Sequence, residues 1–256
     1  MTKSLASVEL DAITKSYGST TIIGDTSVTI KDGEFVSLLG PSGCGKSTIL
    51  KMIAGLAEPS TGTVRAGEQK ITGPGPDRGM VFQDHALLPW MTARGNIDFG
   101  LSSARPELSK KERADITAQH LEQVGLADAA ERRPARLSGG MQQRVGLARA
   151  FAIDPPILLL DEPFGALDAL TRRELQLQLL GIWEASRRTV VMVTHDVDEA
   201  ILLSDRVLVM SKSPEATIIA DIDVDLPRPR HDVSEDPDVE TCTAELRREM
   251  LNLLEH

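Results

Sequence analysis

The sequence predicts an α/β fold with a phosphate-binding loop at its centre, and three observations lead to this prediction. Residues 157–160 are apolar without alternation, which is typical of a parallel strand covered on both faces. Residues 189–195 contain a second apolar run that predicts another core strand. A third apolar run, residues 35–39, continues through a glycine-rich segment into the helix-forming residues 49–54, which is the context that phosphate-binding loops require.

The glycine-rich segment matches the pattern G-x-x-x-x-G-K-[ST] and consists of Gly40, Pro41, Ser42, Gly43, Cys44, Gly45, Lys46, Ser47 and Thr48. Glycines allow successive backbone N–H groups to turn inward, and the helix that follows directs the positive end of its dipole to the same point. Lys46 would reach the β- and γ-phosphates of a nucleotide, and the Ser47 hydroxyl would take one position on Mg²⁺. A glycine-rich turn without function is the alternative for this pattern alone.

Length and composition restrict the class of protein. With 256 residues the chain can bury a sizeable core, as one large domain or as a domain with a subdomain. The formal net charge of -10 argues against nucleic acid as the main partner, because proteins that bind nucleic acid usually present a basic face. No apolar stretch reaches the ~18 residues needed to span a bilayer, and residues 1–10 lack the pattern of a signal peptide. Two cysteines, Cys44 and Cys242, fit a reducing compartment, so we expect a cytoplasmic protein.

The first part of the chain predicts a small antiparallel sheet. Its short β-rich runs, separated by turn signals, are residues 8–10, 21–23 and 28–30. Tyr17, the only tyrosine, lies on one of these turns, where its ring could stack on a nucleobase. An exposed aromatic residue without such a role fits the local sequence as well.

A further apolar run, residues 79–83, ends at Gln83, which places an amide at the edge where open α/β sheets bind ligands. The apolar residues 86–91 follow and include Trp90. Tryptophan and methionine are enriched where another protein docks, whereas burial in a small core beneath the next helices is the alternative. The sequence leaves both interpretations of this segment open.

Residues 108–136 are rich in charge and in helix formers, and they predict a helical insertion with Ser109 as its N-cap and Gly125 as a C-cap. A further helix opens with Ser138, Gly139 and Gly140. The serine can cap the helix, the glycines expose backbone N–H groups, and the helix dipole makes this end positive. Together these features predict a second anion site. An ordinary serine-capped helix is the alternative.

Two carboxylates, Asp161 and Glu162, emerge where the strand of residues 157–160 ends. An acid at this position can hold Mg²⁺, directly or through water, while its neighbour orients or deprotonates the attacking water. His195 ends the next core strand and therefore falls with Gln83 and Asp161 on the ligand-binding edge of the sheet.

The last third of the chain contains further elements. Asp168 precedes a helix predicted over residues 170–187, where an N-cap is its ordinary role. Residues 205–210 and 216–221 predict a closing hairpin. Apolar residues at helical spacing in residues 246–254 predict an amphipathic tail helix.

Six motifs in this order resemble those of ABC transporter ATP-binding subunits. They are the Walker A segment 40–48, the Q-loop residue Gln83, the signature 137–144, the Walker B segment 157–162, the D-loop 166–168 and the switch residue His195. The resemblance extends over nearly the whole chain. It implies a RecA-like P-loop NTPase core with an N-terminal antiparallel β subdomain and a helical subdomain.

The resemblance also implies domain boundaries. The whole chain, 1–256, would form a single ABC ATPase domain. Residues 1–86 and 151–225 would form the β subdomain and the RecA-like core, 87–150 the helical subdomain and 226–256 a C-terminal tail.

In this family two subunits face head to tail, and the signature helix of one grips the γ-phosphate held in the loop of the other. The resemblance therefore implies a homodimer in the ATP-bound state, with Asp168 crossing the interface. It also implies that Glu162 polarises the lytic water, His195 contacts the γ-phosphate, and Gln83 ligates Mg²⁺ and couples to the membrane partner. Tyr17 would stack on adenine.

Four segments are similar to those of the nitrate/sulfonate/taurine importer group: residues 76–79, 87–90, 194–200 and 225–230. The similarity implies an ATPase on the inner face of the cell membrane, with integral membrane permease subunits as partners and, indirectly, a solute-binding protein. A small anion or a sulfonate-like compound would be the solute. The alternatives are an ABC ATPase not linked to transport, and a P-loop kinase or GTPase, which would leave the Ser138 helix and His195 unexplained.

Overall fold

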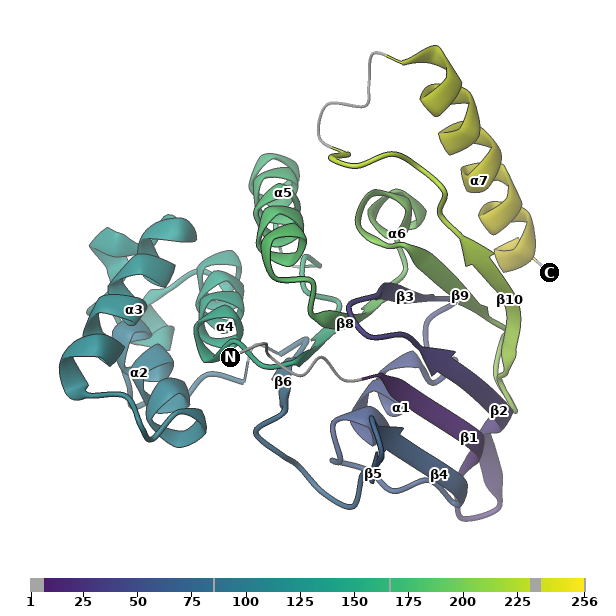
Figure 1. The fold of residues 1–256 in the computed structure, drawn as a ribbon, viewed down its shortest axis with the longest axis horizontal. Helices are drawn as coiled ribbons and strands as arrows, with labels where there is room; N and C mark the ends of the chain where they lie inside the picture. Colours follow the sequence, from purple (N-terminus) through teal and green to yellow (C-terminus); the bar gives the residue numbers. More distant parts are fainter. Residues whose placement is uncertain (1–6, 85, 166, 231–235, 256) are drawn as a thin grey trace.

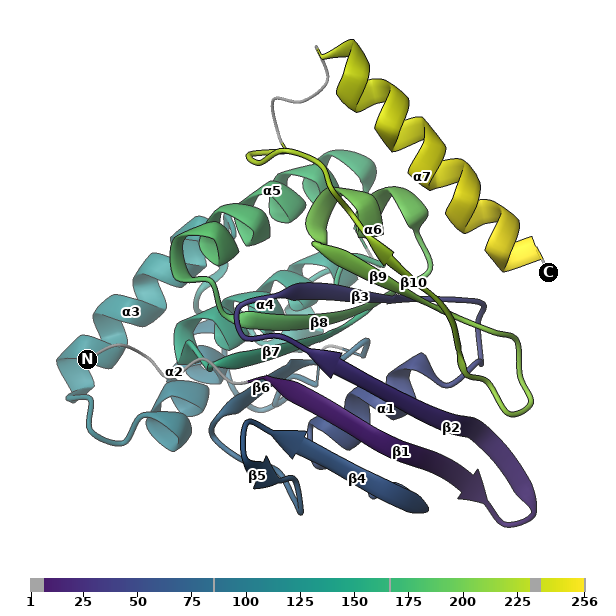
Figure 2. The same cartoon turned by 45° about the vertical axis from the view of Figure 1, so that its right-hand side comes forward.

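Two sheets organise the chain in the computed structural model, which describes residues 7–84, 86–165, 167–230 and 236–255 (Figures 1 and 2). The first sheet is antiparallel, with strand order β2-β1-β4-β5. Its strands are β1 (Val8–Tyr17), β2 (Thr20–Ile30), β4 (Thr61–Ala66) and β5 (Gln69–Lys70). The predicted N-terminal antiparallel sheet is confirmed, and the later hairpin β4–β5 completes it. The predicted runs 21–23 and 28–30 are however one strand, β2, because the chain passes through Gly24 and Asp25 with a shift in its register to β1 rather than a turn.

The second sheet has the order β10-β9-β3-β8-β7-β6, with all neighbours parallel except β9 and β10. Its strands are β3 (Phe35–Leu39), β6 (Arg78–Val81), β7 (Ile157–Asp161), β8 (Thr189–Thr194), β9 (Arg206–Met210) and β10 (Ile218–Asp223). The strands β3, β7 and β8 are buried along their whole length, as their unbroken apolar sequences predict. The parallel strands bring the phosphate-binding loop, Gln83, Asp161 and His195 to one edge.

Helices cover both faces of this sheet. They are α1 (Lys46–Ile53), α2 (Ala93–Ala104), α3 (Lys110–Gln123), α4 (Gly139–Ile153), α5 (Ala169–Ser186), α6 (Val197–Leu203) and α7 (Pro237–Glu255). The helix α1 lies between the two sheets, α4 and α5 cover the opposite face, and α2 and α3 pack on α4 away from the strands (Figures 1 and 2). The helices α6 and α7 cover the edge formed by β9 and β10. Within the described residues, no helix combines the length and apolar character that a membrane span needs.

The helical part agrees with the sequence-based expectation at the ends of α3. Ser109 caps this helix in a capping box, and Gly125 lies just past its end at φ +64, as the sequence predicts. The rest of the insertion contains two short 3-10 helices, Ala127–Ala129 and Pro134–Arg136. The helices α2 and α6 were not predicted. Glycines and polar residues interrupt the helical pattern of α2, which is held by its Thr92 N-cap and by the buried Ile97.

The segment before α2 presents Trp90 to solvent. Its side chain is 65% exposed, so the interpretation of Trp90 as part of a small core is wrong, although the neighbouring Leu87 packs partly against the main core. The buried side chain of Asn96 holds the loop in place: its Oδ1 accepts from the Leu88 N–H at 2.8 Å, and its Nδ2 donates to the Thr92 carbonyl at 3.0 Å. The exposed tryptophan therefore lies on a well-supported loop.

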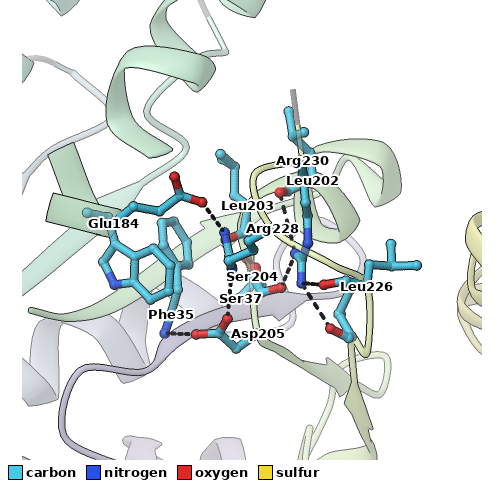
Figure 3. Close-up of polar contacts among 12 residues, drawn as sticks. Phe35, Ser37, Glu184, Leu202, Leu203, Ser204, Asp205, Leu226, Arg228 and Arg230 are labelled. Carbon is cyan, nitrogen blue, oxygen red and sulfur yellow. Dashed lines mark hydrogen bonds and ion pairs between the residues drawn. The ribbon is translucent and has the colours of Figure 1, made fainter. Parts of the chain in front are cut away.

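The C-terminal arm, residues 224–230, is fixed by Arg230 (Figure 3). This side chain is only 6% exposed, and its guanidinium donates to the carbonyls of Ile201 at 2.8 Å and Val224 at 2.9 Å, and to that of Ser204. The groups at Ile201 and Ser204 belong to the end of α6, where helix carbonyls lack partners within the helix. Burial and the charge of Arg228 lower the pKa of Arg230 to about 10.

The neighbouring Arg228 links the same arm to α5 and to the segment between α6 and β9. Its guanidinium lies 4.3 Å from the ring centroid of Trp183, and donates to Asp205 Oδ1 at 2.8 Å and to the Leu203 carbonyl at 2.9 Å (Figure 3). Phe35 also packs on Trp183: the two ring centroids lie 5.8 Å apart, and the rings meet edge to face. The predicted tail helix α7 then packs on α6 and β9 through its apolar face.

We expect Arg230→Met to lower the free energy of unfolding by about 3 kcal/mol, because the buried carbonyls at the end of α6 would lose their charged donor. Urea denaturation of the purified chain measures this change. Arg248→Met, on the exposed side of α7, is the control and should change stability by less than about 0.5 kcal/mol. Equal stability of the two variants would contradict the role given to Arg230.

Candidate functional site

A cleft of about 560 Å³ opens at the carboxyl ends of the parallel strands. Its lining residues are Tyr17, Ile22, Ser42, Gly43, Gly45, Lys46, Ser47, Thr48, Gln83, Glu162 and His195. Apart from Ile22, all of them were expected site residues from the sequence. They come from the first sheet, from the loop after β3, from the first turn of α1 and from the ends of β6, β7 and β8, so the cleft joins the two sheets.

The loop between β3 and α1 requires glycine at two positions. Gly43 and Gly45 have φ of +79 and +98, which side chains rarely adopt. A Cβ on Gly45 would lie 2.3 Å from Ile23 Cδ1, so the loop packs closely on the first sheet. These two glycines give the loop the turn with which backbone N–H groups can surround an anion.

Lys46 places a positive charge at the centre of this loop. Its Nζ donates to the carbonyls of Gly40 at 2.7 Å and Pro41 at 2.9 Å, and the residue is 5% exposed. The two carbonyls thus hold the ammonium group beside the cleft. Cys44 is fully buried in the core behind the loop, which favours a packing role for this small side chain.

The residues beneath the loop fit a magnesium ion. Ser47 Oγ donates to Asp161 Oδ1 at 2.8 Å, so a hydroxyl and a carboxylate lie together, and oxygen is the ligand that Mg²⁺ prefers. Burial raises the pKa of Asp161; the hydrogen bond from Ser47 opposes this shift and the charge of Glu162 adds to it. Within the described part of the chain, no three His, Cys, Asp or Glu residues are arranged to hold a metal ion by themselves. Mg²⁺ at nucleotide sites commonly keeps waters and phosphate oxygens among its ligands, which suits a site with one hydroxyl and one carboxylate.

Glu162 lies where three strand ends meet. Its Oε2 accepts a hydrogen bond from Gln83 Nε2 at 3.1 Å and lies 3.6 Å from His195 Nδ1. The expectation that these side chains share one edge of the sheet is confirmed. A carboxylate held between an amide and an imidazole at the rim of the cleft is suitably placed to accept a proton from water.

The other expected site residues lie elsewhere. Ser138 caps α4 by accepting from the Met141 N–H at 3.2 Å, and neither it nor the two glycines after it lines the cleft of its own chain. Asp168 caps α5 by accepting from the Thr171 N–H at 3.1 Å, a bond that lowers the pKa of this carboxyl. Ala166, the first residue of the expected D-loop, lies outside the described residues.

Gln143 lies within the signature segment 137–144, but the sequence assigned it no role at the site. It is 1% exposed on α4, and its Nε2 donates to the backbone carbonyl of Glu162 at 3.2 Å. Its place one helical turn into the signature helix was visible in the sequence, but its contact with a residue of another element was not. Ile22, which lines the cleft from β2, gave no signal in the sequence.

Comparisons with known proteins agree with this geometry. Residues 23–165 match the ABC transporter family. The nitrate import ATP-binding protein NrtD of Synechococcus elongatus is 48% identical over 253 residues, which cover 96% of this chain and 91% of that protein. The bicarbonate transport ATP-binding protein CmpD of Synechocystis is 46% identical over 241 residues, which cover 92% of this chain and 86% of that protein.

Solved structures show the same fold. The dimeric structure of MJ0796, described as a bacterial ABC transporter cassette, matches with a TM-score of 0.78 at 34% identity, covering 85% of this chain and 98% of that chain. The post-hydrolysis dimer of MJ0796 bound to ADP and Pi matches with a TM-score of 0.77, at the same identity and coverage. The α/β fold predicted from the sequence is therefore an ABC cassette, and the chain belongs to the ABC transporter family as one of its ATP-binding, ATP-hydrolysing subunits.

Proposed function

We propose that this chain energises the import of a small inorganic anion of the nitrate or bicarbonate type. The observation that carries the ATPase part is the convergence of Lys46, Ser47 with Asp161, and Gln83 with Glu162 on one cleft. The solute class is supported by the relatives named for nitrate import and bicarbonate transport, both of which align over nearly the whole chain. Both anions are small, planar and singly charged.

Within the cleft, the loop from Gly40 to Thr48 binds the phosphates of ATP, and Lys46 faces the β- and γ-phosphates. Ser47, Asp161 and Gln83 would hold Mg²⁺, which neutralises phosphate charge when bound.

The remaining residues of the cleft act on the lytic water and on the base. Glu162 orients the attacking water and accepts its proton, and His195 contacts the γ-phosphate. Tyr17 stacks on adenine; its ring is 58% exposed at the rim of the cleft, with Lys15 Nζ 4.9 Å from the ring centroid.

Two copies of the chain complete each other's sites in the ATP-bound state. Ser138, Gly139 and Gly140 lie at the start of α4, where backbone N–H groups have no partner within the helix and can bind an anion. They do not line the cleft of their own chain, so a second copy is needed for them to meet a γ-phosphate. Asp168 crosses the same interface. The dimeric state of the MJ0796 cassette supports this arrangement.

The membrane partner docks on the helical subdomain, residues 87–150, beside the β subdomain and core of residues 1–86 and 151–225. Two exposed aromatic side chains mark the docking surface: Trp90, 65% exposed, and Phe99, 46% exposed. The chain is cytoplasmic and peripheral on the inner face of the membrane, bound to permease subunits, and a solute-binding protein acts on the same permease.

We expect Trp90→Ala to reduce co-purification of a multi-spanning membrane protein at least tenfold, because the exposed indole supplies apolar contact at the docking surface. The measurement is affinity purification of the tagged full chain from detergent-solubilised native membranes. Leu251→Ala removes another exposed apolar side chain, 46% exposed on α7, and should leave co-purification unchanged. Wild-type protein that elutes without a membrane protein would refute the transport assignment while leaving the ATPase chemistry intact.

The solute is tested by uptake in cells whose genomic copy carries Glu162→Gln. Uptake of labelled nitrate or of labelled bicarbonate should fall to the background level of a deletion strain. If uptake of both anions continues unchanged, the proposed solute class is wrong.

A further inference from the structure

The side chain of Gln143 connects the signature helix to the backbone of Glu162. Gln143 lies on α4, five residues after the N-cap Ser138, and is 1% exposed. Its Nε2 donates to the Glu162 carbonyl at 3.2 Å. The same helix therefore carries the predicted second anion site at its start and a contact with the catalytic segment about one and a half turns later.

Glu162 has a backbone conformation that needs support. Its φ is +46, in the left-handed region that residues with a Cβ adopt rarely and that persists where surrounding contacts hold it. The Glu162 N–H donates to the Val193 carbonyl at 3.0 Å, and the Glu162 carbonyl also accepts from the Gly165 N–H at 3.3 Å. The other two bonds are between backbone groups, whereas the one from Gln143 comes from a side chain, which lies on α4.

We propose that Gln143 is a positioning residue for ATP hydrolysis. By holding the Glu162 carbonyl, it keeps the Glu162 carboxylate turned to the cleft, where Gln83 Nε2 and His195 Nδ1 lie 3.1 Å and 3.6 Å from its Oε2. A peptide rotation at Glu162 would move this carboxylate away from both. The inference rests on the proposed catalytic role of Glu162.

The chemistry of the side chain fits this role. A glutamine amide can bind a carbonyl without adding a charge, whereas a lysine or arginine there would place a cation beside the Asp161–Glu162 carboxylates and lower their basicity. Because Ser138 caps α4 and Gln143 lies on the same helix, a shift of the helix start on meeting a phosphate would be carried along α4 to the Glu162 carbonyl. Gln143 thus makes the position of the base depend on the signature segment of the same chain.

The test is Gln143→Met in the purified full-length ATPase, since methionine has a similar length and no N–H donor. We expect kcat to fall 10- to 100-fold while KM for ATP changes less than about twofold, because the base is misplaced and nucleotide contacts are unchanged. In the background of Glu162→Gln, the same substitution should change the residual kcat less than about twofold, because its effect acts through the carboxylate.

Val145→Ala on the same helix is the matched control. Its apolar side chain is fully buried and offers no hydrogen bond, so the variant loses stability but should keep kcat within about twofold. The inference is refuted if Gln143→Met keeps wild-type kcat, if it raises KM in proportion to its loss of kcat, or if its effect persists in the Glu162→Gln background. Failure of the proposed function is a separate result, in which Glu162→Gln itself retains activity.

Discussion

Glu162→Gln should lower kcat for ATP hydrolysis at least a hundredfold, which is about the contribution of a well-placed general base. The amide cannot accept a proton from water, yet it has the same size and can still meet Gln83 and His195. ATP binding should persist, since the loop and Lys46 are unchanged. Phosphate release measured under saturating Mg²⁺-ATP gives kcat directly.

The same variant should accumulate as an ATP-bound dimer, because closure of the two sites would no longer be followed by hydrolysis. Sedimentation with and without ATP measures this change of mass. Glu174→Gln removes an acid from the exposed side of α5 and is the control, with wild-type turnover and no trapped dimer. Unchanged turnover in Glu162→Gln would refute its role as the base, and a monomer with bound ATP would refute the proposed dimer.

Asp161→Asn should abolish Mg²⁺-dependent hydrolysis and at the same time raise the melting temperature by about 2 °C. The asparagine oxygen can still accept the hydrogen bond from Ser47, so the local structure is kept. The substitution removes a carboxylate that is 4% exposed and lies beside the charge of Glu162. Thermal denaturation without nucleotide gives the stability change, and phosphate release gives the activity.

The stability difference should depend on pH in a defined direction. Burial raises the pKa of Asp161 above its unfolded value, so the folded protein binds the proton more tightly than the unfolded chain does. The ionised carboxylate therefore destabilises the protein above the folded pKa, and this cost disappears as pH falls through that pKa toward the unfolded value. The advantage of Asp161→Asn should be largest at neutral pH and shrink in acid. A variant less stable than wild type at neutral pH would show that Asp161 stabilises the fold.

Much of the site could be predicted because its chemistry is local in the chain. The loop from Gly40 to Thr48, the strand that precedes it and the helix that follows form one continuous segment, so residue types and spacing suffice. The strands β7 and β8 were equally clear, since parallel strands buried on both faces have unbroken apolar sequences. The helix α2 was missed because tertiary packing, and not local propensity, holds it.

By itself, the sequence determined which chemical groups this protein has: a phosphate-binding loop, carboxylates at a strand end and a capped helix start, each defined by neighbours in the chain. The tertiary structure decided which of them meet. The strand order β3-β8-β7-β6 brings Glu162 to Gln83 and His195, while Ser138 and Asp168 are kept out of the same cleft. Gln143 meets Glu162 across 19 positions of the sequence, and Arg230 meets Ile201 across 29 positions. Both contacts join different elements. Such contacts follow from how the elements pack, which residue spacing alone does not specify.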